Sequence, residues 1–65
     1  MKTFKQDAQN SGSTKDAANK IAMQIRDSGK AHGDTSASYL SKYFSISSLK
    51  MMLAAVRSGE EIEVK

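Results

Sequence analysis

Basic side chains and hydroxyls gather in residues 35–59 of the 65-residue chain, with no acidic residue among them. Lysine and arginine neutralise backbone phosphates and release counterions, and serine hydroxyls donate hydrogen bonds to phosphate oxygens. We therefore expect the following side chains to be the candidate nucleic-acid contacts: Lys42, Ser47, Ser48, Lys50 and Arg57, with Lys30 and His32 just upstream. The same cations also fit an ordinary solvated helix face, so the charge pattern leaves both interpretations open.

The residue types give little support for a metal site, a phosphate-binding loop or a catalytic site. The chain has no cysteine, and His32 alone cannot build a metal site. The acidic residues show no metal-ligand spacing, and there is no glycine-rich phosphate loop. Serines are numerous, but no nucleophile-elbow motif accompanies them. We predict a protein that is not an enzyme and uses no cofactor, no metal and no small-molecule substrate.

Length and charge limit the kind of protein that can carry these side chains. The 65 residues make one small domain, with ten basic and seven acidic side chains and a net charge of +3. A chain of this length buries only about 60% of its unfolded surface, so its core is marginal. Because disulfides and metals are missing, we expect stabilisation by self-association as a homodimer. There is no membrane-spanning run and no signal-peptide pattern, so we expect a cytoplasmic protein.

Apolar residues at helical spacing predict a first helix over Thr14–Ser28. Its apolar stripe is narrow and rich in alanine, which lets a neighbouring element approach closely. Ser13 and Asp16 approximate a capping box at its start. Residues 1–12, which precede it, are mostly polar, and we expect them to form a flexible arm.

Two further helices are expected to carry most of the candidate contacts. The pattern predicts them over Ser36–Phe44 and Ser48–Arg57, joined by a short serine-containing turn. Ser47 is the expected N-cap of the last helix. Ile46, just before this cap, is expected to pack on Met51 as a hydrophobic staple.

The C-terminal residues alternate polar and apolar side chains, which predicts a strand over Glu60–Lys65. This strand needs a partner, and Thr3 with Phe4, a pair of loop residues or another subunit could supply one. The predicted fold class is therefore mainly α. We expect a compact tri-helical, helix-turn-helix-like core at residues 13–59, followed by the short strand, which pairs with an N-terminal strand if one forms.

The last predicted helix is apolar on two sides, and a helix that is apolar all round is normally buried. The first stripe consists of Leu49, Met52, Leu53 and Val56, and the second of Met51, Ala54 and Ala55. Two arrangements are consistent with this pattern. In one, the preceding turn is longer and the first stripe packs in the core. In the other, the first stripe packs in the core and the second stripe contacts a partner. The residues expected at a dimer or partner interface are Met51, Met52, Ala55, Ile62 and Val64.

The segment YLSKYFSISSLKMMLAAV, residues 39–56, resembles the helix-turn-helix of small winged-helix DNA-binding regulators. The resemblance implies that the last helix enters a major groove while the helix before it braces the contact. The leading interpretation is therefore a small DNA-binding transcriptional regulator that acts as a homodimer.

A second interpretation is a protein-interaction module, such as an inhibitor, an antitoxin or an anti-repressor. Such a module would bind its partner protein through the apolar last helix and the C-terminal strand, which could extend a partner's sheet. A third interpretation is an RNA-binding protein in which Tyr39 and Tyr43 stack on bases.

Overall fold

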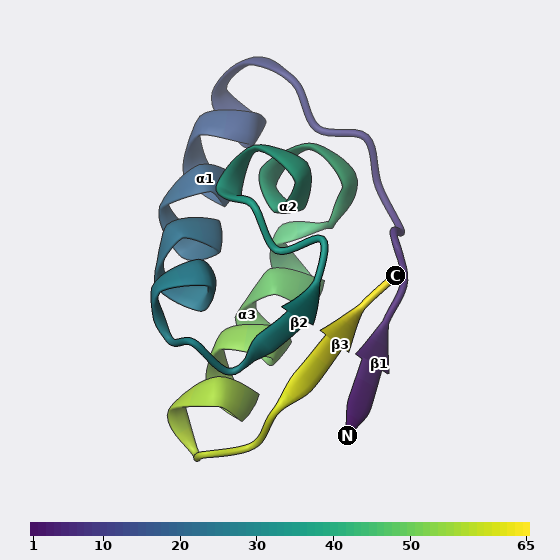
Figure 1. Cartoon of the computed structure of the whole chain (residues 1–65). Helices are drawn as coiled ribbons and strands as arrows, with labels where there is room; N and C mark the ends of the chain where they lie inside the picture. Colours follow the sequence, from purple (N-terminus) through teal and green to yellow (C-terminus); the bar gives the residue numbers. More distant parts are fainter.

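Three helices cover one face of a small three-stranded sheet (Figure 1). The computed structural model describes all 65 residues. The elements in chain order are β1 (Lys2–Phe4), α1 (Gly12–Asp27), β2 (Ala31–Gly33), α2 (Ala37–Tyr43), α3 (Ile46–Arg57) and β3 (Ile62–Val64). The predicted mainly α, tri-helical domain with a short C-terminal strand is confirmed. None of the helices combines the length and the apolar character needed to cross a membrane.

The C-terminal strand β3 is the middle strand of the sheet. β1 and β2 both pair with it in parallel, in the order β1-β3-β2. Ile62 and Val64 are buried against the helices, while Glu63 lies on the opposite side with its register partners Thr3 and His32. The N-terminal segment and a loop segment thus both bind β3. Because both of its edges are paired, the idea that this strand extends a partner's sheet is wrong.

Gly33 permits β2 to approach β3 closely. Its φ is +98°, a left-handed conformation that other residues rarely adopt. A Cβ at this position would overlap the backbone carbonyl of Val64. Part of the segment that joins α1 to α2 is therefore a strand, because a glycine lies where the two backbones meet.

The hydrophobic core lies between α1, the two other helices and β3. It consists of Ala18, Ala22, Ile25, Leu40, Phe44, Leu49, Met52, Ala55, Val56, Ile62 and Val64. The two core alanines of α1 let α2 and α3 pack closely on it, as the narrow predicted stripe indicated. The first apolar stripe of α3 is core as well, with Leu53 partly buried at its edge.

The turn between α2 and α3 is shorter than predicted, because only Phe44 and Ser45 separate the helices. The Ser45 hydroxyl accepts a hydrogen bond from the Ser48 backbone N–H at 3.1 Å and caps α3. The prediction of Ser47 as the N-cap is therefore wrong. Ile46 lies inside the first turn of α3, so it is not placed as a staple residue before the cap.

The start of α1 also differs from the prediction. The helix begins at Gly12 after Ser11, whose side chain makes no capping hydrogen bond. Ser13 and Asp16 lie inside the helix, so they do not form the capping box that the sequence suggested.

Residues 5–11 form a strap that leads from β1 over the end of α2 to α1 (Figure 1). The backbone N–H groups of Asp7 and Ala8 donate to the Tyr43 carbonyl at 3.0 and 3.2 Å. The side-chain amide of Asn10 donates to two more carbonyls of the same region, at 2.9 and 2.7 Å. The strap thereby satisfies carbonyl groups that the end of a helix leaves free. It is held by specific hydrogen bonds where the sequence suggested a flexible arm.

Candidate docking surface

The helix α3 presents one continuous exposed face. Its buried residues recur every three to four positions and hold the opposite side against α1 and β3. The exposed residues, called the docking face below, are Ser47, Lys50, Met51, Ala54, Arg57 and Ser58. Met51 lies on the edge opposite Lys50 and Arg57 and keeps 57% of its surface exposed. Because α2 and α3 contain no acidic residue, Lys50 and Arg57 set the charge of this face.

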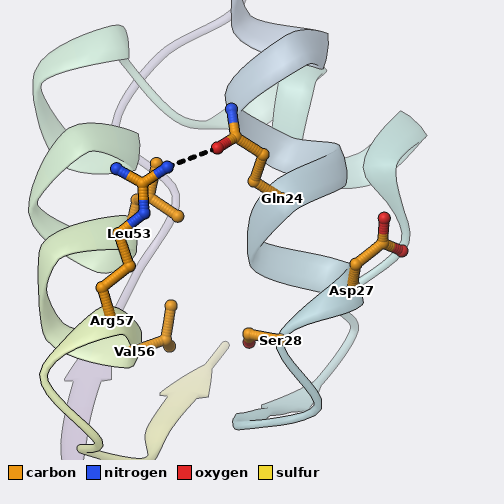
Figure 2. Close-up of a pocket in the computed structure, with 6 residues that line it drawn as sticks. All are labelled: Gln24, Asp27, Ser28, Leu53, Val56 and Arg57. Carbon is orange, nitrogen blue, oxygen red and sulfur yellow. Dashed lines mark hydrogen bonds between the residues drawn. The ribbon is translucent and has the colours of Figure 1, made fainter.

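Shallow grooves lie on both sides of the docking face. The α1–α3 groove has a volume of about 450 Å³ and is drawn in Figure 2. It is lined by Gln24, Asp27, Ser28, Leu53, Val56 and Arg57. The second groove, of about 360 Å³, is lined by Lys2, Met51, Ala54, Ala55, Ser58 and Glu60. The helix α3 is therefore a ridge between two hollows.

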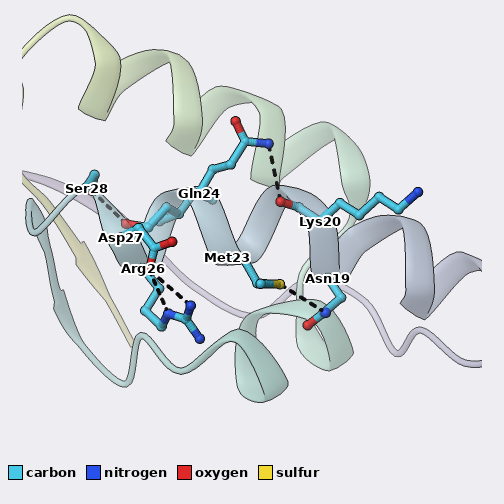
Figure 3. A network of polar contacts seen from close by, with 8 residues as sticks. Asn19, Lys20, Met23, Gln24, Arg26, Asp27 and Ser28 are labelled. Carbon is cyan, nitrogen blue, oxygen red and sulfur yellow. Dashed lines mark hydrogen bonds and ion pairs between the residues drawn. The ribbon is translucent and has the colours of Figure 1, made fainter.

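Arg57 reaches across the α1–α3 groove to Gln24. Its Nη2 donates a hydrogen bond to Gln24 Oε1 at 2.6 Å (Figure 2). The Gln24 amide nitrogen donates to the Lys20 backbone carbonyl at 3.3 Å (Figure 3). This second hydrogen bond helps to orient the amide whose oxygen accepts from Arg57. Arg57 forms no ion pair, and the acid of the groove, Asp27, is paired with Arg26 at 3.0 Å. The positive charge of Arg57 is thus not neutralised within the chain.

The N-terminus of α3 already faces an anion, the carboxylate of Asp7 in the strap. This carboxylate accepts hydrogen bonds from the Ser45 N–H at 2.8 Å, the Ser45 hydroxyl at 3.0 Å and the Ser48 hydroxyl at 2.5 Å. Burial alone would raise the pKa of Asp7, but the hydrogen bonds from Ser48 and Ser45 outweigh it and lower the pKa. The Ser48 hydroxyl, expected to contact phosphate, is therefore engaged within the chain, and a bound phosphate would meet a negative charge there.

The other predicted nucleic-acid contacts lie on other elements. Lys42 is near the end of α2, with its ammonium group 5.3 Å from the centre of the Tyr43 ring. Lys30 precedes β2, and His32 in β2 has its Nε2 2.7 Å from Glu61 Oε1. The hydrogen bond with His32, together with the charge of the imidazole, lowers the pKa of Glu61. Among the predicted contacts, only those on the docking face share one exposed helix surface.

Four of the five predicted interface residues are not available to a partner. These are Met52, Ala55, Ile62 and Val64, each with an exposed fraction of 6% or less. They are covered because the inner side of α3 packs on α1 and the two β3 side chains point at the helices. Met51 alone among the five remains exposed.

No family model, curated protein or solved structure matches the chain. Its function is therefore inferred from the geometry. No three His, Asp or Glu side chains lie close enough together to hold a metal ion. The arrangement offers a surface for contact: an exposed methionine, two cations and two hollows. Sequence patterns did not identify Asp7 or Gln24 as residues that hold the side chains of this surface in place. Their hydrogen-bond partners, Ser45 and Arg57, are 38 and 33 residues away in the chain.

Proposed function

We propose that the chain is a small interaction module, without enzymatic activity, that binds an acidic partner protein through the docking face of α3. The observation that carries the proposal is Met51, 57% exposed, beside the exposed Ala54, with Lys50 and Arg57 along the other edge of the same face. Apolar centres with polar rims are typical of protein contacts, because the centre loses water and the rim charges steer the partner. Since α2 and α3 contain no acidic residue, this steering favours a negatively charged partner.

The spacing of the docking face fits a helix that lies in a groove of the partner. Its members recur at intervals of three and four residues, as the anchors of such helices do. Ala54 is small and lets the partner approach the backbone, while Met51 is flexible and adapts to an irregular pocket. The hollows on both sides of α3 leave room for the walls of that groove.

Charge favours a different protein over a second copy as this partner. In an antiparallel pair of docking faces centred on Met51 and Ala54, Lys50 of one copy would lie within one helical turn of Arg57 of the other. In a parallel pair, each cation would face its own equivalent. Like charges placed opposite each other disfavour both arrangements. A homodimer formed through α3 is therefore disfavoured.

The experiment that tests this proposal is partner capture with two matched methionine variants. The immobilised chain captures proteins from a nuclease-treated lysate of the cell that makes it. Burial of the exposed part of Met51 is worth roughly 1.5 kcal/mol, so Met51→Glu should weaken capture of a specific partner about tenfold or more. Met23→Glu, the same change at a methionine of α1 that is 41% exposed, should not weaken it. Equal capture by both variants, or no specific capture by the wild-type chain, would refute the proposal.

A second candidate function, DNA binding, is favoured by the position of the two cations. Lys50 and Arg57 lie on one exposed face, two helical turns or about 10 Å apart along α3. Such a pair can contact phosphates along one strand. The carboxylate of Asp7 at the start of α3 opposes this use, which is why we place it second.

Fluorescence anisotropy with a random DNA duplex separates the two candidates. A DNA-binding protein should bind at about 50 mM salt and lose much of its affinity at about 200 mM. The variant Lys50→Gln should then weaken binding and reduce the salt dependence. The absence of binding at either salt concentration would remove the DNA candidate and leave the interaction module in place.

A further inference from the structure

We infer that the α1–α3 groove is an anchor site for the C-terminal residue of a partner chain, with Arg57 binding the terminal carboxylate and the groove floor holding an aliphatic side chain. This inference rests on the proposed function, since it names the group of the partner protein that meets one end of the docking face. It concerns a site beside Arg57, whereas the proposed function depends on Met51.

The first argument is the free binding capacity of Arg57. A guanidinium group has five N–H donors arranged to match a carboxylate. Arg57 uses one of its nitrogens on the neutral amide oxygen of Gln24, and it has no carboxylate partner in the chain. The hydrogen bond to Gln24 fixes the guanidinium over the groove, as Figure 2 shows. The site is therefore oriented before a ligand arrives, which reduces the entropy lost on binding.

The second argument is that the negative groups near this site are already compensated. Asp27 is paired with Arg26 through two nitrogens, each 3.0 Å from Asp27 Oδ1. Carbonyl groups at the ends of α1 and α3 are also satisfied, because the hydroxyls of Ser28 and Ser58 donate to them at 2.6 and 2.8 Å. A carboxylate that enters the groove thus meets one uncompensated charge, and that charge is positive.

The third argument is the apolar floor. Leu53 is partly buried and Val56 is 4% exposed, and both line the groove that Arg57 borders. Leu53 and Arg57 are four residues apart on one helix, which places their side chains next to each other. A C-terminal aliphatic residue carries its carboxylate and its side chain on the same carbon, so it can occupy both places at once. An internal acidic residue would need a second residue to fill the floor.

The test is a titration of the ¹⁵N-labelled chain with three small probes, followed by NMR. N-acetylleucine carries the terminal carboxylate and the aliphatic side chain, N-acetylleucinamide lacks the carboxylate, and N-acetylglycine lacks the side chain. We expect saturable shifts at Gln24, Ser28, Leu53 and Arg57 with N-acetylleucine, with a dissociation constant on the order of millimolar. Each of the other two probes should bind at least about tenfold more weakly.

Two variants that each lose one positive charge of the docking face complete the test. Arg57→Gln should abolish the shifts with N-acetylleucine, while Lys50→Gln, outside the groove, should leave them unchanged. Equal effects of the three probes, equal effects of the two variants, or no saturable shift at these amides would overturn the inference. Such a failure would leave the Met51-dependent capture of a partner intact, so the inference and the proposed function can fail separately.

Discussion

Removal of the Asp7 carboxylate should destabilise the fold, because this side chain connects the strap to the start of α3. The side chain accepts three hydrogen bonds from the N-cap Ser45 and from Ser48 in the first turn of α3. Asp7 supports the N-cap Ser45, and we take its loss to cost as much as loss of a cap, roughly 1 kcal/mol; loss of the favourable charge at the helix N-terminus adds up to about 1 kcal/mol. We therefore expect Asp7→Ala to lower the free energy of unfolding by about 2 kcal/mol. For a domain of this size the melting temperature should fall by about 10 °C.

The effect of Asp7 should depend on pH in a defined direction. Its pKa is lowered in the folded state, so the ionised carboxylate contributes stability above its ordinary pKa, and this contribution is lost as the pH falls through the folded-state pKa. Asp7→Asn retains one acceptor oxygen but loses the charge and the second acceptor, since Oδ1 and Oδ2 both accept hydrogen bonds in the wild-type chain. The difference in melting temperature between the wild-type chain and Asp7→Asn should therefore be present near pH 7 and should shrink below about pH 4.

Circular dichroism melts of the variants at both pH values measure these differences. Asp16→Ala is the matched control, because this exposed acid of α1 forms no ion pair and should change stability by less than about 0.5 kcal/mol. Equal loss in Asp7→Ala and Asp16→Ala would show that the strap does not hold the start of α3. A constant difference between the wild-type chain and Asp7→Asn across this pH range would show that the charge is not involved.

Three further changes test the packing and the surface of the molecule. Gly33→Ala should destabilise by roughly 2 to 3 kcal/mol in urea unfolding, because its φ is +98° and a Cβ would overlap the backbone of β3. Met52→Ala should cost about 2 to 5 kcal/mol in the same assay, whereas Met51→Ala should cost less than about 0.5 kcal/mol, since only Met52 is buried. His32→Ala should raise the pKa of Glu61 toward its ordinary value in an NMR titration, because the lowering hydrogen bond and charge are removed.

Regular patterns in the sequence predicted the elements that depend on local periodicity. The alanines and isoleucines of α1 recur at helical spacing, and Ala18, Ala22 and Ile25 are in the core as that spacing requires. The alternation at the C-terminus predicted a strand whose Ile62 and Val64 are buried. These features could be predicted because each pattern repeats within a single element.

The remaining features depend on contacts between distant parts of the chain. Ala54 and Ala55 are identical in type, and only the register of α3 decides that the first is exposed and the second buried. That register follows from the short turn at Ser45, which Asp7 supports from 38 residues away. β2 carries no strand pattern at all, and forms because Gly33 admits the backbone of β3.

The bare side of the sheet strengthens the case for α3 as the contact surface. All-parallel sheets are normally covered on both faces, but this one has helices on one face only. Its open face is polar: Thr3 and His32 flank Glu63, which is also 3.7 Å from the Lys65 ammonium. Lys2 places a charge on the β1 edge, which discourages the addition of another strand. With the sheet face polar and its β1 edge charged, the exposed methionine of α3 is the better place for a partner to gain apolar contact.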